Sequence, residues 1–331
     1  MKNLMTIVVP CFNEEDALPL FAEAAAPIRK ALAAGIYTDS EGNEYSFPPC
    51  KTEIIFIDDG SKDTTLSLLR TYHNDDPLIR YISFSRNFGK EAGIYAGLTA
   101  AKGDYVVLMD ADLQHPIDYL PCMYSLLCSS NEEGEVYDSV AMYRTGRNGE
   151  GRLRAFFSKR FFRMINRISK IDLVDGATDF RMMNRKMVDA VLEMNEYNRF
   201  TKGIFNWVGF NTKWLPYESA ARSAGSSKWS ASGLFRYALE GMFAFSTTPL
   251  TISFTLGIVL CVLAVLYAIF TVVKTLIWGD PVAGFPSIYT MILLLGGIQL
   301  LFLGIMGQYM SKMYLEVKHR PIYITKETSE D

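Results

Sequence analysis

The sequence has few residues of the kinds that build disulfide frameworks and zinc sites. It contains 5 cysteines and 3 histidines in 331 residues, and no CxxC pair occurs. In a reducing compartment we therefore expect no disulfides, and the cysteines should be free thiols. The formal net charge is only −3 at pH 7, which gives no sign of a nucleic-acid partner.

Two common sequence signals are also missing. Residues 85–90 look like part of a phosphate-binding loop, but GxxxxGK[ST] does not occur, which excludes a P-loop NTPase. No apolar stretch with a small-residue cleavage site follows Met1, so we expect no signal peptide. A large cytosolic N-terminal domain is the expected consequence.

Long apolar runs are confined to the C-terminal third. Residues 252–273 and 287–310 contain no charged side chain, and a helix needs about 20 apolar residues to cross a bilayer. Two transmembrane helices are predicted. Basic residues flank the pair on its outer sides, whereas residues 278–286 between the runs contain none, which predicts that both termini are cytoplasmic. The flanking residues are Arg222, Lys228, Arg236, Lys312, Lys318 and Arg320.

Short β-branched runs alternate with helical runs up to about residue 143, which predicts an α/β fold with a mainly parallel sheet. The expected strands are residues 5–9, 53–57, 79–83, 105–109 and 139–143, and the expected helices are residues 16–34, 64–74, 90–101 and 116–129. Residues 35–49 should form a surface excursion. The predicted organisation is a cytoplasmic α/β domain (1–230), an interfacial amphipathic helix (231–248), two spans (249–310) and a cytoplasmic tail (311–331).

Polar clusters follow four of these strands, at residues 10–15, 58–63, 85–90 and 110–115. In open α/β sheets, ligands bind beyond the carboxyl ends of the parallel strands. We therefore expect these four loops to line one crevice.

The loop after residue 109 has two carboxylates, Asp110 and Asp112, followed by Gln114. A divalent cation with oxygen ligands, Mg²⁺ or Mn²⁺, would relieve the repulsion between the carboxylates and also bind a diphosphate. The alternative is a solvated turn in which Asp112 caps the next helix. Zinc is a poor alternative because His115 has no Cys or His at ligand spacing.

Asp58 and Asp59 repeat this arrangement of an apolar strand followed by an acidic pair. One of them could accept a hydrogen bond from a nucleoside. The alternative is the start of an ordinary helix, with Ser61 or Asp63 as its N-cap.

The ordered set Pro-x-Phe-Asn-Glu (10–14), Asp-Asp-Gly-Ser (58–61), Arg-Asn-Phe-Gly (86–89) and Asp-Ala-Asp-Leu-Gln (110–114) resembles the family 2 inverting glycosyltransferases. It is most similar to their polyprenyl-phosphate branch, which includes dolichol-phosphate mannose synthase and bacterial polyprenyl-phosphate glucosyltransferases. The resemblance continues through residues 179–181, 199–203 and 222–229 to the two apolar runs, and so covers most of the chain. The QxxRW sequence of processive synthases is absent, which favours a single transfer.

The resemblance implies a nucleotide-sugar-binding GT-A domain that transfers a hexose, with UDP-glucose favoured, to undecaprenyl or another polyprenyl phosphate. The donor-binding candidates are Pro10, Phe12, Glu14, Asp58, Asp59 and Lys90, and the metal-binding candidates are Asp110, Asp112 and Gln114. Asp112 and Asp179 are the catalytic candidates. Asp179 could act as a base or orient the acceptor, or it could be a capping or salt-bridged residue beside Arg181.

Residues 144–170 are strongly basic, and Arg160, Arg163 and Arg167 share one face of a predicted amphipathic helix. A solvated charged face is the alternative; on a membrane, this helix would attract anionic lipid. The candidates for binding the acceptor phosphate are Arg144, Lys202, Arg222 and Lys228.

Two other classes remain open, a membrane-bound nucleotidyltransferase acting on a lipid and a catalytically inactive membrane scaffold. The sequence does not identify the sugar, the nucleotide or the downstream pathway. Small residues in the second apolar run make a homo-oligomer plausible.

Overall fold

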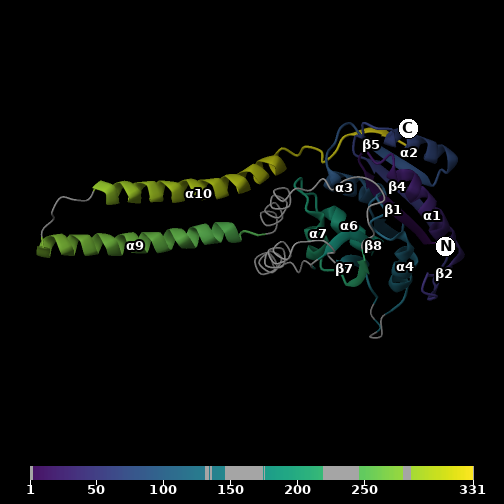
Figure 1. Cartoon of the computed structure of the whole chain (residues 1–331), viewed down its shortest axis with the longest axis horizontal. Helices are drawn as coiled ribbons and strands as arrows, with labels where there is room; N and C mark the ends of the chain where they lie inside the picture. Colours follow the sequence, from purple (N-terminus) through teal and green to yellow (C-terminus); the bar gives the residue numbers. More distant parts are fainter. Residues whose placement is uncertain are drawn as a thin grey trace. The chain divides into compact units, whose positions relative to one another are not determined.

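The structure, a computed structural model, describes residues 3–130, 134, 136–145, 174, 176–218, 246–278 and 285–330. The chain divides into two compact units, residues 1–231 with 321–331, and residues 232–320. Figure 1 shows the helices and strands of both units. The predicted amphipathic helix within residues 144–170, most of the predicted interfacial helix at 231–248, and Arg222 and Lys228 lie outside the described residues.

A mixed sheet forms the centre of the first unit. Its strands are β1 (Asn3–Cys11), β4 (Cys50–Asp58), β5 (Ile79–Phe84), β6 (Tyr105–Leu108), β7 (Ser139–Thr145), β8 (Ala177–Asn184), β9 (Thr212–Glu218) and β10 (Thr325–Thr328). Their order across the sheet is β10-β5-β4-β1-β6-β8-β7-β9. The neighbours β5, β4, β1 and β6 are parallel, whereas β8 is antiparallel to both β6 and β7. All five predicted strands are present, which confirms the α/β class and the mainly parallel sheet.

Helices cover both faces of this sheet (Figure 1). They are α1 (Ala17–Ala34), α2 (Thr65–Asp75), α3 (Lys90–Ala100), the 3-10 turn η1 (Ile117–Tyr119), α4 (Leu120–Cys128), α6 (Arg185–Glu193) and α7 (Thr201–Trp207). Helix α1 contacts α4, and both share one core cluster with α2, while α3 contacts α6. The four predicted helices are confirmed, and the last of them begins with the η1 turn.

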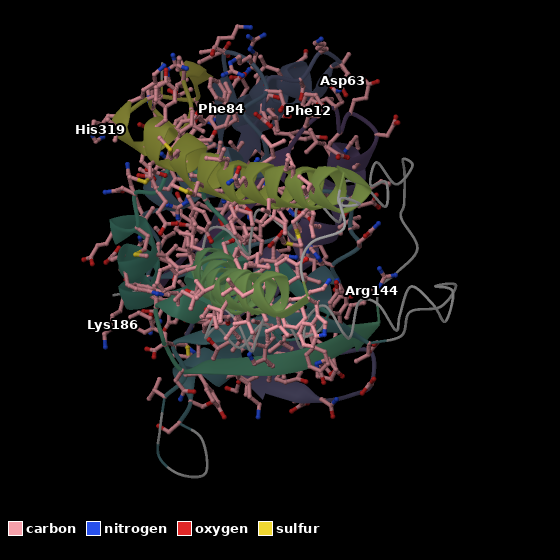
Figure 2. All side chains as sticks on the ribbon, turned by 90° about the vertical axis from the view of Figure 1, so that its left-hand side faces the viewer. Phe12, Asp63, Phe84, Arg144, Lys186 and His319 are labelled. Carbon is pink, nitrogen blue, oxygen red and sulfur yellow. The ribbon has the colours of Figure 1, made fainter. Side chains whose placement is uncertain are left out.

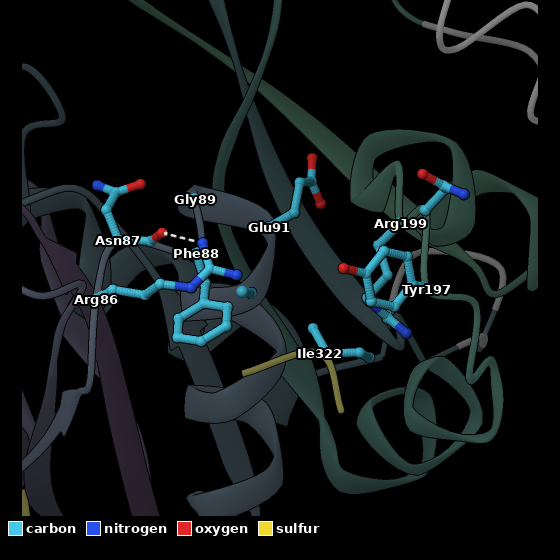
Figure 3. Close-up of a pocket in the computed structure, with 10 residues that line it drawn as sticks. Arg86, Asn87, Phe88, Gly89, Glu91, Tyr197, Arg199 and Ile322 are labelled. Carbon is cyan, nitrogen blue, oxygen red and sulfur yellow. Dashed lines mark hydrogen bonds between the residues drawn. The ribbon is translucent and has the colours of Figure 1, made fainter. Parts of the chain in front are cut away.

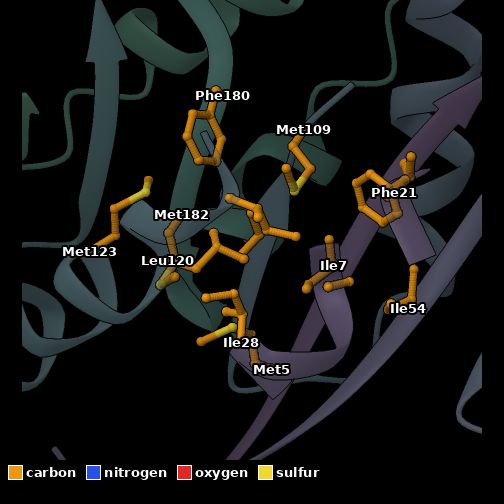
Figure 4. Close-up of a cluster of buried hydrophobic side chains, with 14 of the residues drawn as sticks. Met5, Ile7, Phe21, Ile28, Ile54, Met109, Leu120, Met123, Phe180 and Met182 are labelled. Carbon is orange, nitrogen blue, oxygen red and sulfur yellow. The ribbon is translucent and has the colours of Figure 1, made fainter. Parts of the chain in front are cut away.

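The main core lies between the sheet and the layer of α1, α2 and α4 (Figure 4). Ile7 of β1 and Phe180 of β8 are fully buried in it, and the ring of Phe21 meets Phe56 edge-on with centroids 5.7 Å apart. Strands covered on both faces read as nearly continuous apolar runs, which is why β1 and β4 are recognisable in the sequence.

Residues 35–49 form a small hairpin, β2 (Ile36–Thr38) with β3 (Glu44–Ser46). Phe47, just beyond the hairpin, is buried and meets the ring of Tyr124 edge-on at 5.4 Å. This excursion is therefore anchored to the core from its base.

Helix α3 packs very closely on β1 because it presents Gly97 to the strand. A Cβ atom at Gly97 would lie 2.0 Å from Cγ1 of Val8, and Val8 is fully buried. Since α3 begins at Lys90, this packing also fixes where the first turn of the helix stands relative to the strand ends.

Gly97→Ala is therefore expected to lower the free energy of unfolding by about 1–3 kcal/mol, because the added methyl group has no room. The measurement is the thermal unfolding midpoint of the full chain in detergent. Gly93→Ala is the matched control, since its Cβ would lie at 3.4 Å from Cβ of Pro10 and the better helix propensity offsets this tighter contact. Equal midpoints for the two variants would contradict the close packing.

The C-terminal segment adds β10 to the edge of the sheet, antiparallel to β5. Arg70 donates to both carboxylate oxygens of Glu327, at 2.8 and 2.5 Å, and the hydroxyl of Tyr81 donates to Oε1 at 2.8 Å. The ring of Tyr323 stacks on Phe84 with centroids 4.8 Å apart. The sequence pattern indicates only a tail here, because a short polar strand carries no periodic signal of its own.

Glu327→Gln should release the β10 segment more often, because the amide cannot accept the bidentate bond from Arg70. Limited trypsin digestion with mass spectrometry measures this as faster cleavage after Lys326. Glu330→Gln is the control, since Glu330 is more exposed and pairs with Arg80 at 2.6 Å through one oxygen. If the two variants are cut at the same rate, Glu327 does not hold the strand in place.

The second unit contains two long helices, α9 (Thr248–Trp278) and α10 (Phe285–Val317). Each includes a window apolar enough to cross a membrane, by length and composition: Thr248–Tyr267 with mean hydropathy 2.4, and Leu294–Val317 with 1.3. The predicted spans 252–273 and 287–310 lie within these helices. Their helical structure is confirmed, and their crossing of a bilayer stays a prediction.

Candidate active site

Four loops meet at the carboxyl ends of β1, β4, β5 and β6, as the sequence predicts. The side chain of Asn13 joins the first two loops, because Lys62 donates its N–H to Oδ1 of Asn13 at 2.8 Å. Asp59 joins the second to the third, and Lys90 joins the third to the fourth through Asp110. The four polar clusters therefore form one connected surface. Figure 2 draws the described side chains as sticks and labels Phe12 of the first loop and Asp63 of the second.

The acidic pair after β4 holds this surface together. Asp58 is 1% exposed and accepts from the Ser61 N–H at 2.9 Å and from the Ser83 hydroxyl at 2.7 Å. Asp59 accepts from the N–H groups of Phe88 and Gly89 at 2.6 and 2.9 Å. Burial raises the pKa of Asp59, while these two hydrogen bonds act in the opposite direction. A structural role is thus established for both carboxylates, and their contact with a nucleoside stays a prediction.

Pro10 lies near the end of β1, Phe12 and Glu14 follow the strand, and all three are partly exposed beside this pair. The N–H of Glu14 donates to the hydroxyl of Thr65 at 2.9 Å, and its carbonyl accepts from the first turn of α1. These contacts fix the backbone of the first loop. The three predicted donor-binding residues therefore lie together at the strand end.

The centre of the site is an ammonium group between two carboxylates. Nζ of Lys90 lies 2.7 and 3.0 Å from the two carboxylate oxygens of Asp110 and 2.7 Å from Oδ2 of Asp179. Nζ of Lys202 is 4.0 Å from the other oxygen of Asp179 and donates to the carbonyl of Ala177 at 3.2 Å. Residues from α3, β8, α7 and the loop after β6 are thereby brought together.

Ionic contacts set the protonation of this centre. Burial opposes ionisation of Asp179, but the ammonium groups of Lys90 and Lys202 outweigh it and hold the pKa of this carboxyl well below its ordinary value. Burial also opposes the charge of Lys90, and the carboxylates of Asp110 and Asp179 nevertheless raise its pKa. Both groups are therefore ionised at neutral pH.

Asp112 and Gln114 lie on the same loop as Asp110 and are half-buried, with the N–H of Gln114 donating to Oδ1 of Asp112 at 3.1 Å. In the described part of the chain, no three His, Cys, Asp or Glu residues gather as a metal-binding group. Mg²⁺ is nevertheless commonly held by one or two carboxylates together with substrate phosphates. The carboxylates of Asp110 and Asp112 and the amide of Gln114 offer oxygen donors, so this loop fits a hard divalent cation that shares its ligands with a diphosphate.

His115 has a place in this loop that its sequence context does not reveal. It is 6% exposed, its ring stacks on Phe180 at 5.2 Å, and its Nδ1 lies 3.4 Å from the N–H of Asp110. Burial lowers the pKa of His115, with Asp110 opposing the shift. A neutral imidazole therefore supports the backbone of the acidic loop. Only the pairing of β8 with β6 brings Phe180 beneath it.

Arg181 is a buried charged residue behind the site that the sequence alone does not place. It is 1% exposed, its Cζ lies 3.8 Å from the ring centroid of Phe205, and its Nε and Nη1 have no hydrogen-bond partner in the described structure. Burial lowers the pKa of Arg181 to about 10, and Asp179 opposes this shift. Its charge adds to the positive potential around Asp179.

Of the four candidates for an acceptor phosphate, the structure describes two. Lys202 belongs to the centre, whereas Arg144 lies exposed at the end of β7 and donates its N–H to the carbonyl of Gly176 at 2.9 Å. The remaining two, Arg222 and Lys228, lie outside the described residues.

A separate open pocket of about 370 Å³ lies beside the first turn of α3 (Figure 3). Arg86 extends along one wall, with its Cζ 4.2 Å from the ring centroid of Phe88. Glu91 lines the pocket and binds the N–H and hydroxyl of Thr201, and Ile322 of the C-terminal segment completes the lining. Lys90 and the two carboxylates that bind it are not part of this lining.

Residues 6–192 match the model of a family described as glycosyl transferase family 2. The SfII prophage-derived bactoprenol glucosyl transferase of Shigella flexneri is 38% identical over 98% of this chain and 98% of its own length. The prophage bactoprenol glucosyl transferase homolog of Escherichia coli (strain K12) is 38% identical over 97% of this chain and 98% of its own length. CsbB of Bacillus subtilis (strain 168) is 40% identical over 99% of this chain and 93% of its own length.

Solved structures resemble this chain more distantly. The mannosyltransferase PcManGT from Pyrobaculum calidifontis, in complex with GDP-Man and Mn²⁺, is 14% identical and gives a TM-score of 0.43, covering 95% of this chain and 85% of that chain.

Proposed function

The chain belongs to glycosyl transferase family 2 and is a glycosyltransferase with the GT-A fold. We therefore propose that it transfers a hexose from a nucleotide sugar to polyprenyl phosphate. The observation that carries the proposal is the 38% identity, over 98% of both chains, to a protein named as a bactoprenol glucosyl transferase. UDP-glucose is the favoured donor and undecaprenyl phosphate the favoured acceptor. The product would serve glycosylation of the cell envelope.

The donor would occupy the crevice formed by the four loops. Pro10, Phe12 and Glu14 would contact the nucleoside, together with the turn at Asp58 and Asp59. The diphosphate would then lie above the first turn of α3, where N–H groups and the helix dipole favour an anion. This position brings the sugar towards Asp179 and Lys202.

Asp110 and Asp112, with Gln114, are the residues that would hold Mg²⁺ or Mn²⁺. A bound divalent cation supplies charge neutralisation for the departing nucleoside diphosphate. The oxygen donors of the loop, two carboxylates and an amide, support this assignment.

In the proposed reaction, an oxygen of the acceptor phosphate attacks the anomeric carbon as the bond from that carbon to the diphosphate oxygen breaks, which inverts the centre. A phosphate monoester has a second pKa of about 6, so the acceptor is already largely ionised at neutral pH and needs no strong base. Asp179 is a weak base because its pKa is low. Its contacts favour a positioning role, in which it holds Lys90 and Lys202 where both phosphate groups meet.

A membrane location supplies the acceptor. Helices α9 and α10 have the length and composition to cross the bilayer of the bacterial inner membrane, and we propose that they anchor the catalytic unit on its cytoplasmic side. Arg144, Arg222 and Lys228 would then join Lys202 in binding the lipid phosphate at headgroup level.

The transfer assay uses the detergent-extracted full chain with Mn²⁺ or Mg²⁺, undecaprenyl phosphate, and UDP-glucose, UDP-N-acetylglucosamine or GDP-mannose labelled in the sugar. We expect labelled lipid in the organic phase from one donor, lost with EDTA and reduced more than about a hundredfold by Asp112→Ala, because a metal ligand is removed. Asp118→Ala, an exposed acidic residue of η1, is the matched control.

Label in the lipid that survives both EDTA and Asp112→Ala would refute the metal assignment. Transfer of label from the base instead of the sugar would identify a nucleotidyltransferase, and the absence of any labelled lipid would refute the proposed acceptor.

Asp179→Asn keeps the shape of the side chain but removes the charge that positions Lys90 and Lys202. We expect turnover to fall by roughly a hundredfold. The acid limb of the pH–rate profile should stay near pH ~6 in both proteins, because it reports the acceptor phosphate. Near-normal turnover of the variant, or loss of this limb, would contradict the positioning role.

A further inference from the structure

The ammonium of Lys90 lies at the position in the proposed site that a divalent cation would occupy when it binds Asp110. Its ammonium lies within 3.0 Å of both carboxylate oxygens of Asp110, so the side on which Asp110 would ligate a cation is already taken. The same ammonium binds Asp179 at 2.7 Å. A divalent cation could bind Asp110 only if this ammonium moved away.

The position of Lys90 in its helix makes such a move favourable when an anion arrives. Lys90 is the first residue of α3, and a cation at a helix N-terminus is opposed by the helix dipole unless anions lie beside it. In the structure, Asp110 and Asp179 are those anions. A diphosphate above the same turn would offer Lys90 an alternative partner.

The side chain is also able to move. It is 43% exposed, whereas that of Asp179 is 15% exposed, and a lysine ammonium stands on a flexible four-carbon stem. By contrast, the backbone of the preceding residue is fixed, because Asp59 accepts the N–H of Gly89 at 2.9 Å. Movement would therefore be limited to the side chain of Lys90.

We propose that Lys90 is an internal counter-ion that binds Asp110 in the donor-free enzyme and moves to the diphosphate when the nucleotide sugar and the divalent cation bind together. This inference rests on the proposed function. Lys90 thereby couples the two ligands: it excludes the cation from Asp110 until a diphosphate draws its ammonium away. On departure of the product nucleotide, Lys90 returns to Asp110 and expels the cation with it.

Such coupling is a binding property and can be measured without turnover. If a nucleotide increases the affinity of the protein for Mn²⁺, then Mn²⁺ must increase its affinity for that nucleotide by the same factor. If Lys90 is the coupling group, removing its charge should strengthen Mn²⁺ binding in the absence of nucleotide and weaken the coupling. A side chain with a purely structural role would give no increase in affinity.

The experiment measures the dissociation constant of Mn²⁺ by electron paramagnetic resonance of the free ion, on the full chain in detergent, alone and with saturating UDP or GDP. The variants are Lys90→Met, Lys90→Arg, which keeps the charge, and Lys102→Met as the matched control. Lys102 is 71% exposed and lies 3.8 Å from Glu330, away from the site. Unfolding midpoints verify that each variant is folded.

For the wild type, Lys90→Arg and Lys102→Met, we expect weak Mn²⁺ binding that one nucleotide tightens by about tenfold or more. For Lys90→Met, Mn²⁺ binding without nucleotide should be about tenfold tighter than in the wild type, and the effect of the nucleotide should shrink. Sugar transfer by Lys90→Met should fall even though its metal affinity rises.

Unchanged or weaker nucleotide-free Mn²⁺ binding by Lys90→Met would overturn the inference while leaving the proposed transferase intact. Mn²⁺ binding that is insensitive to Asp112→Ala in the presence of nucleotide would instead refute the metal site on which both proposals depend.

Discussion

The parallel pairing of β1 with β4 on one side and with β6 on the other is the constraint on which the site depends. It brings the carboxyl ends of these strands to one edge, and side-chain bonds then join the loops that follow. Asp59 is central to this joining, because its two oxygens hold the turn that starts α3. These contacts fix the turn that precedes α3, and the packing of α3 on β1 at Gly97 fixes the helix that follows.

Local patterns in the sequence are sufficient to predict this half of the site. Buried parallel strands such as β1 and β4 contain continuous apolar runs, residues 7–9 and 54–57, and each is followed by a distinct polar cluster. The contact of Lys90 with Asp110 could not be predicted in the same way, because it depends on how closely α3 packs at Gly97. Likewise, the pattern predicts that Asp58 and Asp59 lie at a strand end, but it does not predict which groups they hydrogen-bond.

The other half of the site depends on long-range pairing that leaves little local signal. Asp179 reaches the centre because β8 inserts between β6 and β7, antiparallel to both. Resemblance to a family singles out Asp179, but periodicity does not. The same strand carries Phe180, on which His115 stacks, and Arg181, which lies over the ring of Phe205 in α7. β10 is an extreme case, since its partner β5 precedes it by more than two hundred residues.

Because of this separation in the sequence, the sheet is completed late during synthesis of the chain. The ribosome completes β5 and then has to make both long apolar helices before the residues of β10 exist. During that interval β5 is an unpaired edge strand, and such edges readily associate with other chains. Completion of the catalytic sheet therefore waits for synthesis of the helices. A nascent chain that stalls before residue 325 carries an unfinished sheet edge, which quality-control factors can recognise.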